Sequence, residues 1–166
     1  MEFFKKPIDI KKVVPSNRNR SGKYKVLNPE KYLGDLNAVV YRSSYERAFC
    51  VWCDESDDII KWESEPFAIP YISQVDNKQH NYFIDFYAKI KDATGVESDY
   101  LVEVKPKSRL QKPVYPKPAT SKKIASFNEQ AKEYIRNLSK FAAAKKYAAS
   151  IGYNFIIVTE DHLFNR

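Results

Sequence analysis

Short apolar runs of two kinds alternate along this 166-residue chain, some with the period of a strand and some with that of a helix. The spacing Ser-x-x-Glu at Ser43 and Glu46 is the pattern of a capping box and predicts a helix over 43–55. The next stretch, 59–71, is rich in strand-forming residues, and its two prolines place part of it at a sheet edge.

Two further runs, 82–90 and 100–105, flank a turn that contains Gly95. They predict a β-hairpin with a longer loop. This pairing would bring Asp85 of the first run close to Glu103 of the second.

The last third of the chain predicts an extended connection, two helices and a final strand. Residues 106–119 contain four prolines, so we expect no packed element there. Helices are expected over 121–136 and 139–150, with Gly152 as the stop signal of the second, and the apolar run 153–158 predicts a buried strand. The order helix, three strands, two helices, strand predicts an α/β (α+β) fold built on a mixed sheet.

The first 28 residues carry many basic side chains and few apolar ones. This composition predicts a basic N-terminal arm, 1–28, that has no core of its own and becomes ordered on DNA or a partner. The remainder, 29–166, is expected to form one domain, since its length suits a single hydrophobic core.

The net charge of +7 is distributed unevenly along the chain. Residues 1–31 hold nine Lys/Arg against three Asp/Glu (+6), 32–103 six against fourteen (−8), 104–146 twelve against two (+10), and 147–166 one against two (−1). Basic flanks around an acidic middle suit a protein that binds a polyanion and holds metal ions with carboxylates. A solvated basic surface explains the charge alone equally well.

Membrane-spanning proteins and zinc-binding proteins fit this sequence poorly. No apolar run approaches the roughly 20 residues of a membrane-spanning helix, and no secretory signal is recognised, so we expect a soluble, intracellular protein without a membrane partner. Cys50 and Cys53 are accompanied by only two histidines in the chain, which makes four zinc ligands hard to assemble. We expect buried thiols there, and we expect Trp52 and Trp62 to pack in the core.

Two acids lie inside apolar strand patterns. Asp85 and Glu103 each have large apolar neighbours on both sides, and burial of an unpaired carboxylate is costly unless a cation, a metal or a pKa shift compensates it. Lys105 follows Glu103 at a spacing of two, so both side chains project from the same face of the strand.

An acid and a base at this spacing favour phosphodiester hydrolysis assisted by a divalent cation. Mg²⁺, for which Mn²⁺ is a substitute, binds carboxylates, offsets charge on the phosphoryl oxygens and activates a water. Asp85 and Glu103 would be metal ligands, Val104 would add its backbone carbonyl, and Glu46 would complete the site through the metal or a bound water. Lys105 would position or deprotonate the attacking water.

Each of these residues also has a purely structural interpretation. Glu46 stands at the N3 position of the expected capping box, and the local sequence alone favours a capping role for it. Glu103 and Lys105 alone suit an exposed pair on a half-solvated strand. The apolar neighbours of Asp85 make a structural role harder to sustain for that residue, and the spacing of all four together favours an active site.

A second set of residues is expected to assist catalysis or to bind DNA. Gln130 and Tyr134 match the Q-x-x-x-Y element of some nucleases and are accessory candidates, although an ordinary amphipathic helix gives the same spacing. Basic residues of the same region are expected to bind backbone phosphates. These candidates are Lys107, Arg109, Lys122, Lys123 and Lys132. Lys140, Lys145 and Lys146 belong to the same set of helix lysines, for which a solvated helical face is nearly as good an explanation.

Five blocks of the sequence, 41–46, 62–71, 82–85, 102–107 and 158–161, follow one another within about residues 32–163. In this order they resemble the T4-type phage head completion nucleases, which are small PD-(D/E)xK proteins similar in turn to the TnsA-like endonucleases. The sequence departs from the pattern where Ile84 replaces the proline before the strand aspartate, and its basic arm is longer than the family core requires.

The resemblance implies a restriction-endonuclease-like fold and a virion protein of the head and neck, present in the host cytoplasm during assembly, that processes DNA ends after packaging. Its partners would be double-stranded DNA and portal or neck proteins, and no oligomeric state is implied. Two alternatives stay open. One is a structural plug that keeps the nuclease fold and binds DNA or portal without cutting; the other is a TnsA-like transposition subunit, which the short chain disfavours.

Overall fold

A computed structural model describes residues 21–164 of the chain. The helical elements are η1 (Pro29–Lys31), α2 (Ser44–Glu55), η2 (Lys107–Arg109), α3 (Ser121–Ser150) and α4 (Glu160–Phe164). The strands are β1 (Gly22–Lys23), β2 (Val40–Tyr41), β3 (Ile59–Ser64), β4 (Ala68–Ile72), β5 (Gln79–Phe83), β6 (Phe86–Lys91), β7 (Glu97–Val104) and β8 (Asn154–Val158).

The centre of the fold is a four-stranded sheet with the order β3, β6, β7, β8. Strand β6 is antiparallel to both of its neighbours, β3 and β7, whereas β8 runs parallel to β7. The predicted hairpin is present as β6 and β7, and Gly95 adopts a φ of 88° in the turn between them. The predicted α/β fold with a mixed sheet, and the predicted final strand, are therefore confirmed.

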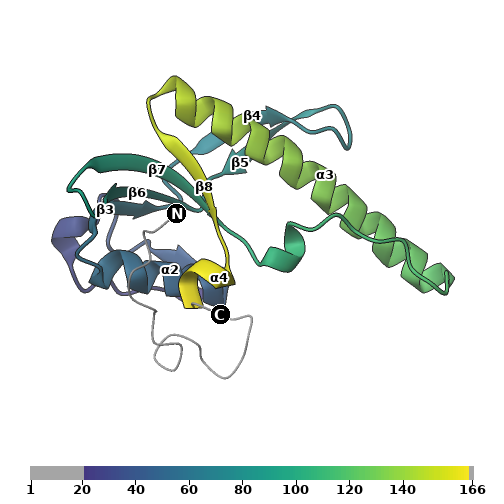
Figure 1. The fold of residues 1–166 in the computed structure, drawn as a ribbon, viewed down its shortest axis with the longest axis horizontal. Coiled ribbons are helices and arrows are strands. Elements are labelled where there is room, and N and C mark those ends of the chain that lie inside the picture. Colours follow the sequence, from purple (N-terminus) through teal and green to yellow (C-terminus); the bar gives the residue numbers. More distant parts are fainter. Residues whose placement is uncertain (1–20, 165–166) are drawn as a thin grey trace.

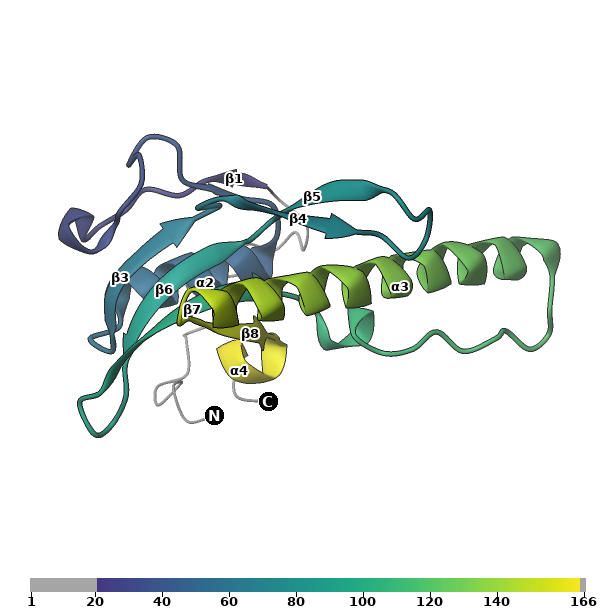
Figure 2. The same cartoon turned by 90° about the horizontal axis from the view of Figure 1, so that it is seen from above.

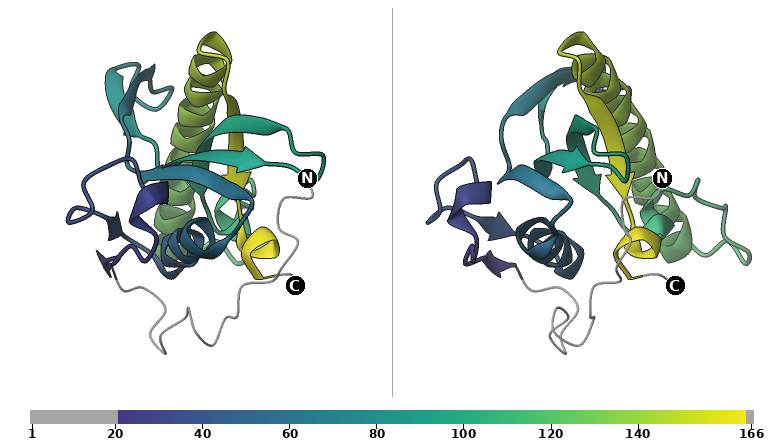
Figure 3. Two further views of the ribbon diagram at one scale, coloured as in Figure 1. Left: turned by 90° about the vertical axis from the view of Figure 1, so that its left-hand side faces the viewer. Right: turned by 60° about the vertical axis from the view of Figure 1, so that its left-hand side comes forward.

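Alternate residues of β7 pack against two different helices. Val102 and Val104 lie in one core cluster with Phe49 of α2, and Leu101 lies in a second cluster with Ala144 of α3. Because successive side chains of a strand point to opposite faces, α2 and α3 cover opposite faces of the sheet (Figures 1 and 3). The middle of β7 is thus enclosed on both sides, which explains its nearly continuous apolar sequence.

The helix predicted over 43–55 is present as α2 with Ser43 as its N-cap. The backbone N–H of Glu46 donates to Oγ of Ser43 at 3.1 Å, as a capping box requires. The buried thiols and indoles predicted for this part of the chain are also confirmed. Buried residues here include the free thiols of Cys50 and Cys53 and the indoles of Trp52 and Trp62.

The apolar run 82–90 forms two strands, so its prediction as one arm of the hairpin is wrong over its first half. Strand β5 leaves the central sheet and pairs with β4 in a separate two-stranded sheet. The backbone N–H of Ile84 donates to the carbonyl of Phe67. The chain therefore changes sheets at Ile84 and Asp85. Asp85 stands just before β6, where its backbone carbonyl accepts from the N–H of Glu65 at 2.9 Å.

The two helices predicted over 121–136 and 139–150 are one continuous helix, α3. The interval 121–150 contains neither proline nor glycine, and Ser139 stays helical while its hydroxyl donates to the carbonyl of Ile135 at 3.1 Å. The predicted stop is confirmed, because Gly152 has a φ of 77°. Figure 2 shows that the first half of α3 extends beyond the sheet, with the proline-rich connection beside it.

The boundary of the basic arm at residue 28 needs correction for the part that the structure describes. Val26 is buried in the core cluster of α2, and Tyr24 donates to Oδ2 of Asp54 at 2.9 Å. Residues 22–28 are thus anchored to α2. The rest of the predicted arm, 1–20, lies outside the described residues.

Two small elements and one negative result complete the description. The connection 106–119 contains the three-residue η2, and α4 follows β8 without having been predicted. Within residues 21–164, no helix combines the length and apolarity that a membrane crossing requires.

Candidate active site

Asp85 and Glu103 face each other across the β6–β7 hairpin. Phe86 pairs with Val102 in the antiparallel register, so one step outward along both strands places Asp85 opposite Glu103. The carboxylate of Asp85, which stands just before β6, is turned toward β7, because its Oδ2 accepts from the backbone N–H of Val104 at 2.8 Å. The hairpin therefore brings together the two acids that the sequence singled out.

Glu103 is an acid in the interior, with 2% of its surface exposed. Its Oε1 accepts a hydrogen bond from Nζ of Lys105 at 2.8 Å, and its Oε2 accepts one from the hydroxyl of Tyr82. Both carboxylate oxygens thus have a donor, and the predicted proximity of Glu103 and Lys105 on one strand face is present.

Asp85 is half-buried at the bend between β5 and β6, and its Oδ2 accepts a hydrogen bond from the backbone N–H of Val104 at 2.8 Å. Burial, and next the negative charge of Glu103, raise the pKa of Asp85 well above its ordinary value. Two neighbouring carboxylates carry two negative charges when both are ionised, and the single ammonium of Lys105 neutralises only one of them.

Lys105 is a cation at neutral pH. Burial lowers its pKa, but the carboxylates of Glu103 and Asp85 outweigh this effect, and the pKa lies above its ordinary value. Of the two roles predicted for Lys105, the geometry therefore favours positioning over proton abstraction, because a protonated amine cannot act as a base.

Glu46 lies at the start of α2, and its carboxylate is engaged with the chain before the helix. Its Oε2 accepts from the backbone N–H of Arg42 at 2.7 Å, and its Oε1 accepts from the hydroxyl of Ser43 at 2.9 Å. The capping role is thus present. The charge of Glu46 also contributes to raising the pKa of Asp85, so the capping carboxylate acts on one of the two strand acids.

The acids of this site have the chemistry of divalent-cation ligands. In residues 21–164, no three Asp, Glu, His or Cys side chains converge tightly enough to form a ready-made metal cluster. Asp85 and Glu103 nevertheless supply two opposed carboxylates, the ligand type that Mg²⁺ prefers, and Mg²⁺ retains several waters when only one or two carboxylates hold it. The chemistry of this donor set fits Mg²⁺ or Mn²⁺, and Asp85 and Glu103 would be the ligands. The Val104 carbonyl and Glu46 stay predictions as further ligands.

Two of the predicted DNA contacts, Lys107 and Arg109, belong to η2 beside the site. Nζ of Lys107 lies 2.6 Å from Oδ2 of Asp161, and Nη1 of Arg109 lies 2.7 Å from Oε2 of Glu133. Both pairs are exposed to solvent, where exchange of a carboxylate for a phosphate costs little.

The other predicted DNA contacts lie along α3. Lys132 is paired with Glu129 at 2.9 Å, while Lys122 and Lys123 are exposed on the first turn of the helix, at the end farthest from the sheet (Figure 1). These lysines would reach DNA only if it extended well beyond the acids.

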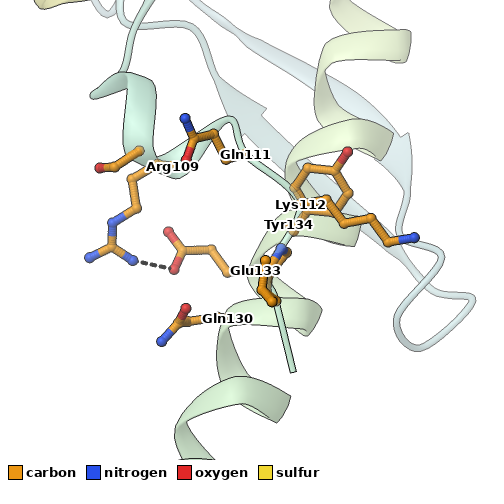
Figure 4. Close-up of a pocket in the computed structure, with 9 residues that line it drawn as sticks. Arg109, Gln111, Lys112, Gln130, Glu133 and Tyr134 are labelled. Atoms are coloured by element: carbon orange, nitrogen blue, oxygen red, sulfur yellow. Dashed lines mark hydrogen bonds and ion pairs between the residues drawn. The ribbon is translucent and has the colours of Figure 1, made fainter. Parts of the chain in front are cut away.

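Gln130 and Tyr134 line a hollow of about 410 Å³ between α3 and the connection that contains Lys112 (Figure 4). Gln130 also lines a second hollow, which opens on Lys105. The structure therefore brings Gln130 to the edge of the site, and it places Tyr134 on the side of α3 that faces the connection.

Two residues near the acids were missed by the sequence analysis, and a third, Lys140, was expected only as one of a set of phosphate-binding lysines. Tyr82 was assigned to the hairpin strand without a role, and Asn137 fell at the expected break between two helices. A helix predicted without a break would have placed Asn137 and Lys140 on one face with Gln130, since these positions repeat at helical spacing. No local signal distinguishes Tyr82, whose contact depends on the separate β4–β5 sheet.

Two comparisons with known proteins bear on this geometry. The family model for the TnsA-like endonuclease N terminal matches residues 56–160. The chain is also similar to a head completion nuclease of Enterobacteria phage T4, with 37% identity over 143 residues that span 86% of this chain and 93% of the phage protein. The segment matched by the family model contains Asp85, Glu103 and Lys105.

Proposed function

The chain belongs to the TnsA-like endonuclease family, and from this premise we propose that it is a metal-dependent endonuclease that hydrolyses phosphodiester bonds of double-stranded DNA. The family implies a restriction-endonuclease-like fold, and the mixed sheet between α2 and α3 agrees with it. The observation that carries the proposal is the placement of Asp85 opposite Glu103, with Lys105 2.8 Å from the second acid.

The acids and the lysine of the site would have different roles in hydrolysis. Asp85 and Glu103 would hold Mg²⁺ or Mn²⁺, which when bound supplies positive charge for the phosphoryl oxygens and acidifies the attacking water. Lys105 keeps hydrogens beyond the one that it donates to Glu103. It would donate one of them to a non-bridging oxygen of the scissile phosphate, which orients the phosphate and offsets the charge that develops on it.

Tyr82 and the Val104 backbone N–H act on the acids themselves. Each donates to one carboxylate, Tyr82 to Glu103 and Val104 to Asp85. Such outer contacts fix the orientation of metal-binding carboxylates and exclude other rotamers. The site is therefore arranged before any substrate arrives.

We propose that this activity serves phage head completion, because the phage T4 relative bears that name and matches most of the chain. The protein would then act on DNA ends after packaging, with portal or neck proteins as partners, in the virion and in the host cytoplasm during assembly. Co-sedimentation of the protein with DNA-filled heads, and its absence from empty heads, would be the expected result.

Plasmid cleavage tests the enzymatic part of the proposal. Wild-type protein should nick or linearise supercoiled plasmid with Mg²⁺ or Mn²⁺ and lose this activity in EDTA. Asp85→Ala should be inactive, while Asp57→Ala, which removes an exposed carboxylate in the loop before β3, should cut like wild type.

Equal activity of wild type and Asp85→Ala would overturn the assigned site. DNA binding without cleavage by the wild type, in either metal, would favour the alternative of a structural head-completion protein that retains a nuclease fold.

A further inference from the structure

A hollow of about 520 Å³ lies between Lys105 and the middle of α3. The residues that α3 contributes to it repeat at intervals of three and four and so occupy one face of the helix. They are Ser126, Glu129, Gln130, Glu133, Arg136, Asn137 and Lys140. This surface, here called the α3 pocket, begins at the candidate active site, because Nζ of Lys105 is 2.8 Å from Glu103.

Asn137, one of the residues that line the α3 pocket, has a side-chain donor without a partner. The residue is 5% exposed, and its side-chain Nδ2 is buried without a hydrogen-bond acceptor among the described residues. Buried polar groups of folded proteins nearly always have a partner. A residue that lines a hollow and holds an unpartnered donor is a candidate contact for a ligand that carries an acceptor oxygen.

The charges that line the α3 pocket indicate that this ligand is an anion. Four cations, Lys105, Arg109, Arg136 and Lys140, line it, against two acids, Glu129 and Glu133. Each of the two acids is already paired with a basic residue, Glu129 with Lys132 and Glu133 with Arg109.

Arg136 and Lys140 form no ion pair with a carboxylate in the part of the chain that the structure describes. Nζ of Lys140 lies over the ring of Tyr82, 5.3 Å from its centroid. Burial, and next the neighbouring charge of Lys105, lower the pKa of Lys140. A bound anion would offset both effects.

We propose that the α3 pocket binds a backbone phosphate of DNA that is adjacent to the scissile phosphate in the same strand. Asn137 and Lys140 would contact this phosphate. The proposal rests on the function proposed above. It adds two positioning residues on α3 that hold the strand while Lys105 contacts the scissile phosphate. Amide and ammonium groups are common partners of DNA phosphates, and such contacts set the register of the protein on the duplex.

The test is the affinity for a fluorescein-labelled duplex, measured by anisotropy in EDTA so that no strand is cut. Lys140→Gln and Asn137→Asp should each raise Kd by about tenfold, and Lys140→Gln should also reduce the slope of log K against log salt by about one. Lys91→Gln removes the same charge from the opposite end of β6, where the residue is exposed, and should bind like wild type. Wild-type affinity and salt slope in both pocket variants would overturn the proposal.

A second measurement covers the case in which Asn137→Asp fails to fold. In wild-type protein, the side-chain amide resonance of Asn137 should shift on titration with inorganic phosphate, and it should shift less in Lys140→Gln. No shift would contradict the pocket. Both measurements detect binding without cleavage. A wild-type protein that binds DNA but never cuts it would contradict the proposed function, and the binding data would still test the α3 pocket.

Duplexes with a 5′-phosphate and with a 5′-hydroxyl distinguish two sources of the phosphate. Equal weakening of both by Lys140→Gln supports the internal backbone phosphate proposed here. If Lys140→Gln weakens binding of the phosphorylated duplex only, the α3 pocket binds a terminal phosphate, and the proposal of an internal backbone phosphate is wrong.

Discussion

The hydroxyl of Tyr82 donates a hydrogen bond to Oε2 of Glu103, and this contact joins the small β4–β5 sheet to the buried acid of β7. Since Lys105 occupies the other oxygen of Glu103, the carboxylate is held from two sides. Burial, and next the charge of Glu103, raise the pKa of Tyr82, so the phenol stays protonated and remains a donor at any physiological pH.

Tyr82→Phe should therefore weaken both stability and cleavage. It leaves a buried carboxylate oxygen without its donor, which costs about 1–3 kcal/mol, and it frees a metal-binding carboxylate to rotate, which lowers metal affinity or activity by about 10–100-fold. Urea unfolding and the Mg²⁺ dependence of plasmid cleavage would measure the two effects. Tyr71→Phe alters a buried tyrosine that packs on His80, and it should leave the Mg²⁺ dependence unchanged.

Asp85→Asn should make the metal-free protein more stable than wild type at neutral pH. The pKa of Asp85 is raised in the folded state from an ordinary value of 3.8, first by burial and then by Glu103. Above the unfolded pKa, the folded protein therefore binds more protons at this position than the unfolded chain does, and stability falls as pH rises. Asparagine removes this penalty and can still accept from the Val104 N–H.

The difference between the two proteins should grow as pH rises from about 4 in EDTA. Mg²⁺ should stabilise wild type only, by about 2.7 kcal/mol at one hundred times its Kd. Thermal unfolding across pH, with and without Mg²⁺, provides the measurement. If Asp85→Asn is less stable than wild type at pH 7 in EDTA, then burial and the charge of Glu103 do not destabilise the Asp85 carboxylate, and the prediction is wrong.

Proximity of Asp85 and Glu103 was predictable from the sequence because a hairpin is local. The turn at Gly95 determines the register, and the register determines which side chains are opposed. The chemistry of these two residues and Lys105 followed from the same pattern, since acids in apolar strands are costly without a compensating partner.

Long-range features were not predictable in this way. The departure of β5 from the hairpin depends on its pairing with β4, which local sequence does not reveal. The continuity of α3 is a local feature, since 121–150 contains neither proline nor glycine, and the break expected within this interval was required by none of its residues. Tyr82 and Asn137 were missed for these two reasons, whereas Lys140 was expected to bind phosphate but was given no place in the site.

Asp54→Ala should destabilise the fold strongly, because this buried carboxylate holds residues 22–28 against α2. It accepts from the hydroxyl of Tyr24 at 2.9 Å and from the backbone N–H groups of Leu27 at 2.7 Å and Asn28 at 2.9 Å. A buried donor left without its partner costs about 1–3 kcal/mol. Asp54→Ala leaves three donors without an acceptor, so it should cost at least about 3 kcal/mol.

Urea unfolding measures this loss, and amide hydrogen exchange at Leu27 and Asn28 should accelerate with it. Asp57→Ala, three residues away on an exposed position, serves as the matched control and should stay within about 0.5 kcal/mol of wild type. Protected amides at Leu27 and Asn28 in Asp54→Ala would show that the segment is held by other contacts.

Glu46 combines two roles that substitution can separate. Its carboxylate accepts from the Arg42 N–H and the Ser43 hydroxyl, and its charge reaches Asp85. Glu46→Gln keeps an amide oxygen for the backbone donor while the hydroxyl of Ser43 can turn to accept. The glutamine variant therefore removes the charge with little effect on the cap, whereas Glu46→Ala removes both.

Glu46→Ala should lose about 1 kcal/mol of stability and Glu46→Gln less than about half of that, as expected for the loss of a helix cap. If the charge serves catalysis, both variants should cut plasmid about 100-fold more slowly than wild type, the scale of a lost acid-base or metal contact. Cleavage that follows stability, with Glu46→Gln near wild type, would instead assign Glu46 to the helix alone. The comparison of the two substitutions thus decides a question that the hydrogen bonds of Glu46 leave open, because the same carboxylate geometry serves either role.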